Sequence, residues 1–279
     1  MGIESHRHHN EAARRRWGLL ARALTSSRDP SDQQKQDIIS CRRISNFGLI
    51  QITPMNSDWF LYSFKEYFVK IRHLSNALTP EDLMGFNNTG NICVWPSEEV
   101  LAYYVLFNRS YFKGKTVLEL GGGMSCLAGL FIAKYTEALH VHLTDGNCTS
   151  VKNVKRILEE NKLEENVSCS VLQWGEIPNE KYDILLAADC LFFDDTRKEL
   201  VKTMWACLKA GGNGLVTAPR RSSTLDKFLE EVQSIGFKYY MSECYNQHVW
   251  ERHEQLKREC PYYDSDIHYP VFIHLTKSL

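Results

Sequence analysis

The sequence has 279 residues, of which 43% are hydrophobic and 24% charged, and its formal net charge is −1. This composition is typical of a folded globular protein with one substantial domain, and it excludes disorder of the whole chain. A net charge so close to zero provides no general attraction to nucleic acid, and no apolar run approaches the roughly 18 residues of a membrane span. We therefore expect neither a nucleic-acid partner nor a membrane.

The nine cysteines are odd in number, and no two of them are spaced as C-x-x-C. That spacing is typical of zinc sites and redox dithiols, so we expect no metal. Several cysteines lie within apolar runs, where a small hydrophobic side chain packs well, and this indicates reduced thiols. The pattern favours a cytoplasmic protein, or one that is also nuclear, and we expect a monomer.

The N-terminal part of the chain divides into two regions. Residues 1–40 are rich in His, Arg, Gln and Ser, which predicts a flexible basic extension. Residues 41–90 form a β-rich arm, in which we predict two strands and a turn between 43 and 74. A helix is expected over 97–111, with Ser97 as its N-cap.

From residue 116 onward, predicted strands and helices alternate within a domain that spans 91–279. The strands are expected at 116–120, 141–144, 167–174, 182–188, 215–218, 237–245 and 269–276. The helices are expected at 125–134, 149–163, 196–208, ended by Gly211 and Gly212, at 223–234, and at 248–259. Alternation of this kind indicates an α/β fold, a mostly parallel sheet with helices on both faces. The last two strands lack a crossover helix of the usual kind, so we expect them to form an antiparallel edge hairpin.

A glycine-rich turn follows the first strand of this series. The strand 116–120 runs into Gly121, Gly122 and Gly123, and a helix comes next. In open α/β sheets, ligands bind beyond the carboxyl ends of the strands, and glycines let the backbone approach them closely. Asp145 ends the next strand, where a carboxylate can accept both ribose hydroxyls of an adenosine. The pattern predicts a nucleotide or nucleoside cofactor, the alternative being a tight turn without a ligand.

Two further residues bear on the kind of cofactor. A dinucleotide-binding motif requires glycine at the position of Cys126, so a dinucleotide is disfavoured. S-adenosylmethionine has a charged amino acid end and a sulfonium, and the acidic Glu119 on the first strand suits it. The alternative for Glu119 is a carboxylate that braces the glycine loop through hydrogen bonds.

Four motifs together resemble the seven-strand family of S-adenosylmethionine-dependent enzymes that methylate lysines in non-histone proteins. They are Glu119–Gly123, Leu143–Asn147, Trp174 and Ala188–Phe192. The flanking stretches 88–104, 124–130, 218–221 and 268–270 resemble the calmodulin-lysine methyltransferases within this family. The similarity extends from about residue 43 to the C-terminus.

The resemblance implies a Rossmann-like seven-stranded sheet, a methyltransferase domain over 91–279 and S-adenosylmethionine as cofactor. It also implies that the cofactor is contacted by Trp95, Gly121, Gly122, Gly123, Asp145, Asn147, Trp174 and Ala188. The chain departs from the family pattern at Ser125, where a further glycine is usual, and at Phe192, where a tyrosine is usual. No tyrosine hydroxyl at that position can therefore orient the target amine.

The catalytic task is to present a neutral lysine amine to the methyl group. A lysine of pKa about 10.4 is protonated at pH 7, and removing the proton costs about 4 to 5 kcal/mol, which desolvation in an apolar channel can supply. We expect Asp189, after the fourth strand, to orient the amine and Phe192 to form an apolar wall that also holds methylated forms. The alternative for Asp189 is a carboxylate that caps the next turn.

The expected substrate is calmodulin, methylated up to trimethyllysine. Calmodulin is acidic, so its docking needs a local basic surface, for which Arg220 and Arg221 are candidates; the alternative is that these are solvated surface charges. A second candidate is the stretch before the final strand that contains Arg252, His253, Lys257 and Arg258. Two other functions stay open. One is methylation of a chaperone or elongation factor, and the other is a non-catalytic adaptor that only binds the cofactor.

Overall fold

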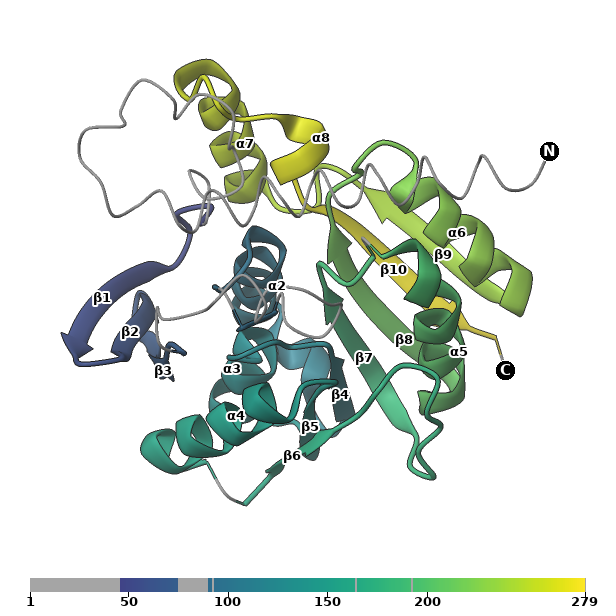
Figure 1. Ribbon diagram of the computed structural model, residues 1–279, viewed down its shortest axis with the longest axis horizontal. Coiled ribbons are helices and arrows are strands. Elements are labelled where there is room, and N and C mark those ends of the chain that lie inside the picture. The colour runs from purple at the N-terminus through teal and green to yellow at the C-terminus, as the bar shows by residue number, and fades with distance from the viewer. Residues whose placement is uncertain (1–45, 75–89, 92, 164, 192, 279) are drawn as a thin grey trace.

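The computed structural model describes residues 46–74, 90–91, 93–163, 165–191 and 193–278 (Figure 1). Its main element is a seven-stranded sheet in the order β6-β5-β4-β7-β8-β10-β9. The strands are β4 (Thr116–Leu120), β5 (His140–Asp145), β6 (Val167–Val171), β7 (Tyr182–Ala188), β8 (Leu208–Ala218), β9 (Phe237–Ser242) and β10 (Val271–Lys277). The first five are parallel, and β10 is antiparallel to both β8 and β9. The expected Rossmann-like sheet and antiparallel C-terminal strands are confirmed, with β9 as the edge.

Helices cover both faces of this sheet. They are α2 (Pro96–Phe107), α3 (Leu127–Tyr135), α4 (Cys148–Asn161), α5 (Arg197–Cys207), α6 (Thr224–Ile235), α7 (Gln247–Glu259) and the short α8 (Ser265–His268). The chain runs outward from β4 through β5 to β6, and then in the opposite direction from β7 to β8. Because crossover connections are right-handed, this reversal puts α3 and α4 on one face and α5 on the other. Helix α2 packs on α3, and α6 packs on α5 (Figure 1).

Two of the expected helix boundaries were wrong. Helix α2 begins at Pro96 with Trp95 as its N-cap, and Ser97 lies inside the first turn, where its carbonyl accepts a hydrogen bond from Thr217 Oγ1 at 3.0 Å. Proline is favoured at the first helical position because the missing N–H would have no partner there. Helix α5 ends at Cys207, and the glycines expected to end it lie within β8 instead.

The arm contains three strands, one more than the sequence predicted. Strands β1 (Gln51–Asn56), β2 (Trp59–Phe64) and β3 (Tyr67–Arg72) form an antiparallel sheet. The extra turn joins β2 to β3 through Lys65, whose φ of +52° is left-handed. Residues in this conformation are usually glycine or asparagine, so a lysine at this position did not predict a turn.

The arm is tied to the domain by polar contacts with α4. Asn161 accepts a hydrogen bond from the backbone N–H of Lys70 at 2.9 Å and donates to its carbonyl at 2.7 Å. Asn153 donates to the carbonyl of Arg72 at 2.8 Å. These amides satisfy groups along β3 that a further strand would otherwise pair, and so they attach this edge of the small sheet to α4.

The segment before β1 is held by a buried carboxylate. Glu99 in α2 accepts hydrogen bonds from the backbone N–H groups of Phe47, Leu49 and Ile50 at 2.5, 2.7 and 3.0 Å. Burial raises the pKa of Glu99, and these N–H groups act against that rise. This carboxylate therefore faces the arm and has a task separate from the site described below.

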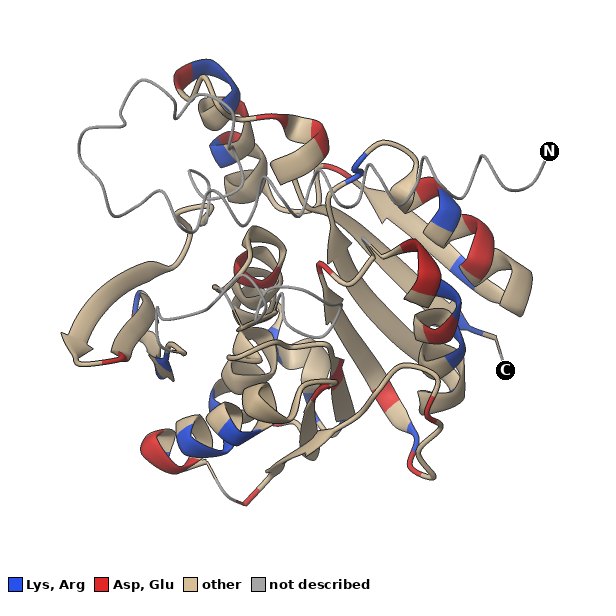
Figure 2. Cartoon of the chain, viewed as in Figure 1, with Lys and Arg blue, Asp and Glu red and all other residues tan. Residues whose placement is uncertain are grey.

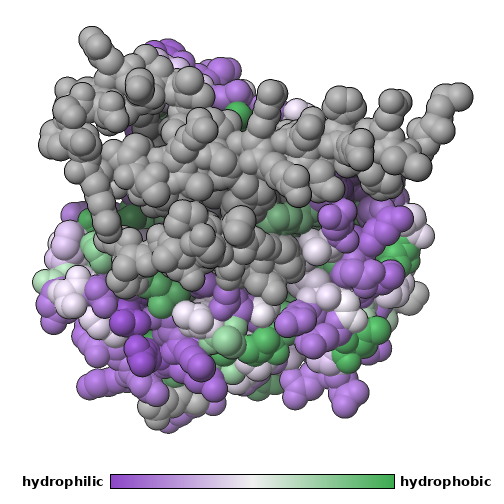
Figure 3. Space-filling view, viewed as in Figure 1, coloured by the Kyte–Doolittle hydropathy of each residue, from purple (hydrophilic) through white to green (hydrophobic). Residues whose placement is uncertain are grey.

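The surface agrees with a globular chain. In Figure 2 the central strands are mostly tan, while charged residues lie mainly on helices such as α4, α5, α6 and α7. Outside the residues drawn in grey, Figure 3 shows hydrophilic residues interspersed with small hydrophobic areas. Among the described residues, no helix has the length and apolar character that a membrane crossing requires.

Candidate active site

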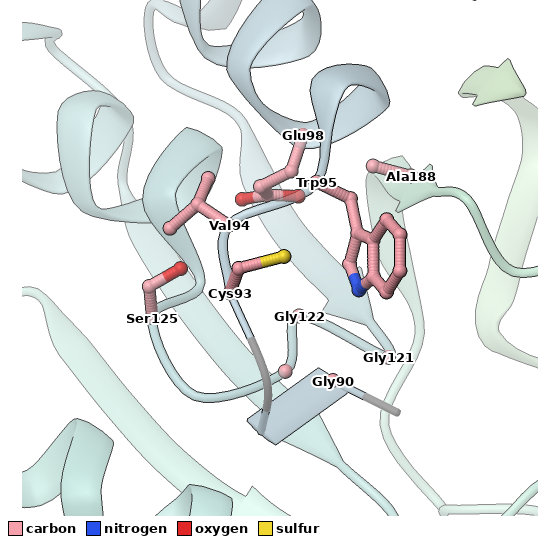
Figure 4. Close-up of a pocket in the computed structure, with 10 residues that line it drawn as sticks. Gly90, Cys93, Val94, Trp95, Glu98, Gly121, Gly122, Ser125 and Ala188 are labelled. Atoms are coloured by element: carbon pink, nitrogen blue, oxygen red, sulfur yellow. The ribbon is translucent and has the colours of Figure 1, made fainter. Parts of the chain in front are cut away.

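A pocket lies at the carboxyl ends of β4 and β7, beside the start of α2 (Figure 4). It is lined by Gly90, Cys93, Val94, Trp95, Glu98, Gly121, Gly122, Gly123, Ser125 and Ala188. Five of the residues expected to bind cofactor therefore meet in one place, namely Trp95, the three glycines and Ala188. Four of the other lining residues, Gly90, Cys93, Val94 and Glu98, were not among the sequence candidates, although all of them belong to the conspicuous stretch around Trp95.

The glycine loop has a backbone that other residues would disturb. Gly121 and Gly123 have φ values of +63° and +59°. A Cβ on Gly121 would lie 2.9 Å from Cys190 Sγ and 3.2 Å from the indole of Trp174. A Cβ on Gly123 would lie 2.7 Å from the carbonyl oxygen of Gly90. The loop is therefore closely packed on both sides, and its glycines leave the pocket wall as bare backbone.

Asp145 holds this loop in place. Its Oδ2 accepts a hydrogen bond from the N–H of Gly123 at 2.9 Å, and its Oδ1 accepts one from the N–H of Asn147 at 2.8 Å. Burial raises the pKa of Asp145, and the two N–H groups act against that rise. Each carboxylate oxygen has a second lone pair, so Asp145 can brace the loop and still accept a ribose hydroxyl.

Two other cofactor candidates, Asn147 and Trp174, do not line the pocket but lie next to residues of its wall or of the loop behind it. Asn147 caps α4, since its side chain accepts a hydrogen bond from the N–H of Thr149 at 2.7 Å. Trp174, after β6, packs against the outer side of Gly121. Figure 4 shows the indole of Trp95 on the side of the pocket formed by Ala188. A flat apolar ligand such as a purine could therefore lie near an indole on the pocket wall.

Glu119 is fully buried on β4, behind the glycine loop. Its Oε2 accepts a hydrogen bond from the N–H of Gly129 in α3 at 3.0 Å. Desolvation raises its pKa well above the usual range, and the adjacent carboxylate of Glu98 raises it further. The structure thus gives Glu119 a contact with α3 and not with the glycine loop. The residue that lines the pocket is a second carboxyl group, Glu98, which the sequence did not single out.

Asp189 follows Ala188 at the end of β7 and is held in a defined geometry. Its backbone N–H donates to the carbonyl of Thr217 at 2.8 Å, and its φ of +54° is left-handed. Arg221 donates to both carboxylate oxygens, from Nη1 to Oδ1 and from Nη2 to Oδ2, the second at 3.0 Å. Arg221, one of the residues expected to dock an acidic substrate, therefore forms an ion pair with Asp189, the expected catalytic carboxylate. Sequence spacing gave no signal for this pair, because the two residues come from different loops.

Arg220 has a partner of its own. It pairs with Glu243 at 2.6 Å, and both side chains are exposed at the surface. Phe192, the expected apolar wall, lies outside the described residues. No group of three or more His, Cys, Asp or Glu side chains in the described part of the chain could hold a metal ion.

Comparisons with known proteins agree with this geometry. The sequence model of a family described as lysine methyltransferase matches residues 80–235. The chain is 34% identical to the Calmodulin-lysine N-methyltransferase of Arabidopsis thaliana, over 95% of this chain and 96% of that protein. It is 31% identical to the Histone-arginine methyltransferase METTL23 of Homo sapiens, over 40% of this chain and 60% of that protein.

One solved structure supports the fold alone. It is a methyltransferase in complex with the Haloferax volcanii Trm112 methyltransferase activator, which aligns with a TM-score of 0.51 and 13% identity. The alignment covers 65% of this chain and 91% of that chain.

Proposed function

Because this chain belongs to the lysine methyltransferase family, we propose that it methylates a lysine of calmodulin, up to trimethyllysine. The observation that carries the proposal is the full-length similarity to the Arabidopsis protein, which covers the arm as well as the catalytic domain. The matches to more distant methyltransferases cover 40 to 57% of the chain. If the arm takes part in substrate recognition, the Arabidopsis protein is therefore the relative with which this chain would share its substrate.

The methyl donor is S-adenosylmethionine, and the pocket fits it. Gly121 to Gly123 line the pocket with backbone alone, as the close approach of a nucleoside ligand requires. The donor has a cationic amino acid end and a sulfonium, and the carboxyl group of Glu98 faces the pocket. When bound, it supplies an electrophilic methyl group on sulfur.

We propose that Asp189 receives the target amine. It is adjacent to the pocket residue Ala188, and its carboxylate is buried and fixed by Arg221. Each of its oxygens has a further lone pair that can accept an N–H of the lysine. Asp189 would hold the amine with its lone pair directed toward the donor's methyl group, and the proton that the lysine ammonium loses beforehand would pass to water. Phe192 would provide the apolar wall that favours the neutral amine.

The structure changes how docking of an acidic substrate should be tested. Reversing Arg221 would also disturb Asp189, whereas Arg220 pairs only with Glu243 at the surface. We therefore expect Arg220→Glu alone to raise the KM for calmodulin and to weaken its dependence on salt. Cofactor affinity should stay unchanged.

The decisive experiment uses labelled S-adenosylmethionine with purified calmodulin, a chaperone and an elongation factor as separate substrates. Mass spectrometry of the labelled protein identifies the lysine and the number of methyl groups. Asp189→Asn is the matched control, because asparagine tolerates the left-handed backbone but removes the charge. Label in the chaperone or elongation factor alone would reject calmodulin. Cofactor binding without transfer to any protein would favour an adaptor.

We also propose that the protein acts in the cytoplasm, and in the nucleus as well. The support is its cysteine chemistry, since no disulfide joins the cysteines of the described residues. Reducing compartments keep such thiols unpaired.

A further inference from the structure

Two buried carboxyl groups meet at the N-terminus of α3. Glu98 Oε1, from the first turn of α2, accepts a hydrogen bond from the N–H of Ala128 at 2.9 Å. Glu119 Oε2, from β4, accepts one from the N–H of the next residue, Gly129, at 3.0 Å. The two groups thus share the positive end of one helix, where a single negative charge is stabilised.

The position of Gly129 shows how closely the second carboxylate approaches. A Cβ at this position would lie 2.4 Å from Glu119 Oε2. The glycine therefore opens the space in which Glu119 reaches the helix.

The hydrogen-bond pattern is complete only if one of the two groups carries a proton. With both ionised, Oε1 of Glu119 is buried and has no donor. The two carboxyl groups accept from adjacent N–H groups at the start of α3, so a proton on one of them would supply a donor at this position. An unsatisfied buried oxygen costs about 1 to 3 kcal/mol, and more when it is charged, so the protonated arrangement is favoured.

Among the described residues, the groups that act on the pair include no cation that could replace this proton. The groups that face the pair are Asp145 on β5, the thiol of Cys126 before α3 and the thiol of Cys190 after β7. None of them can be positively charged. Two carboxylates with no cationic partner repel each other, and burial strengthens that repulsion.

Glu98 connects this pair to the pocket. It is one of the lining residues, and Figure 4 shows its carboxyl group extending from α2 toward the glycine loop. We propose that Glu98 and Glu119 share one proton in the absence of ligand, and that the cationic part of S-adenosylmethionine displaces this proton when it binds. The inference rests on the proposed function only for the identity of the ligand, because the number of protons released on binding is measured without any methyl transfer.

The test is isothermal calorimetry of cofactor binding in buffers that differ in ionisation enthalpy, near neutral pH. The slope of the observed enthalpy against the buffer enthalpy gives the number of protons released. We expect the wild-type protein to release about one proton per S-adenosylmethionine, and 5′-methylthioadenosine, which has no cationic centre, to release none. S-adenosylhomocysteine has the ammonium but no sulfonium, so it distinguishes the two cations. If it also releases a proton, the ammonium displaces that proton; if it releases none, the sulfonium does.

Two variants make the test specific to the pair. In Glu98→Gln the amide can accept from Ala128 and donate to Glu119, so the fold is kept and the release should disappear. Glu119→Gln should have the same effect from the other side. Glu99→Gln neutralises the neighbouring buried carboxylate that faces the arm, and it should release protons as the wild-type protein does.

Stability of the ligand-free protein gives an independent measurement. The folded-state pKa of Glu119 is raised, so its contribution to stability is present at low pH and lost as pH rises through that folded pKa. Glu98→Gln removes the repulsion, and its Tm relative to wild type should therefore increase as pH rises above the usual range of carboxyl pKa values. Equal proton release in wild type and Glu98→Gln would overturn the proposal. Failure of all three ligands to bind would instead refute the cofactor site on which the proposed function depends.

Discussion

Replacing Arg221 by methionine tests whether the ion pair at the end of β7 positions Asp189, the carboxylate that we propose to be catalytic. The side chain of Asp189 is 7% exposed and that of Arg221 is 24% exposed. Loss of one partner costs about 3 to 5 kcal/mol in a fully buried pair and about 1 kcal/mol or less in an exposed one. For this intermediate burial we expect a loss of about 2 to 3 kcal/mol, which lowers Tm by about 4 to 10 °C in a domain of this size.

The kinetic effect should exceed what lower stability explains. A carboxylate that is no longer held from two sides can move by about 1 Å, and such a displacement can cost up to about 100-fold in rate. We expect kcat for methyl transfer to fall about 10- to 100-fold at a temperature where the variant is folded, with the KM for S-adenosylmethionine unchanged. Steady-state assays with calmodulin and labelled cofactor measure both parameters, and circular dichroism measures folding.

The neighbouring arginine provides the control. Arg220→Met removes a surface pair with Glu243, whose side chains are 38% and 47% exposed, so it should cost less than about 1 kcal/mol and leave kcat unchanged. Arg221→Lys keeps the charge but loses the two-point contact, and it should recover part of kcat. A folded Arg221→Met protein with wild-type kcat would refute the positioning role.

Three further substitutions test the site and the fold. Asp145→Ala should weaken S-adenosylhomocysteine binding at least 10-fold in calorimetry, because the N–H of Gly123 loses its acceptor along with any ribose contact; unchanged affinity would contradict this. Gly121→Val should abolish binding and also lower Tm, since its φ is left-handed and its Cβ would collide with neighbouring side chains; a stable, active variant would show that the loop can rearrange. The pKa of Asp183 is about 2, because burial is outweighed by backbone and side-chain hydrogen bonds and by Lys209. Its stabilisation is present above about pH 4 and is lost as pH falls toward 2, so Asp183→Asn should lower Tm at pH 7 and have little effect near pH 2.

Much of the fold could be predicted from local patterns. The alternation of short apolar runs with amphipathic segments was sufficient to order the strands and helices, because the buried faces of both elements recur with fixed periods. The misses have local causes as well. Lys65 has a left-handed backbone conformation, which a lysine in the sequence does not predict. Strand β8 begins directly at the end of α5, whereas the glycines after α5 suggested a longer connection.

The sequence by itself also determined where a ligand would bind. Gly121 to Gly123, Asp145 and Ala188 follow or end parallel strands, and such ends meet at one edge of a sheet whatever the details of packing. Their approximate positions therefore follow from chain order alone.

Only the tertiary structure decided which charged groups meet at that edge. Glu98 reaches Glu119 because α2 packs on the start of α3, and Arg221 reaches Asp189, 32 residues away, because the loop after β8 lies beside the end of β7. These pairs depend on side-chain directions and on the packing of separate elements. Hydrophobic periodicity determines which face of an element is buried, but it does not determine which polar side chain meets another across the interface.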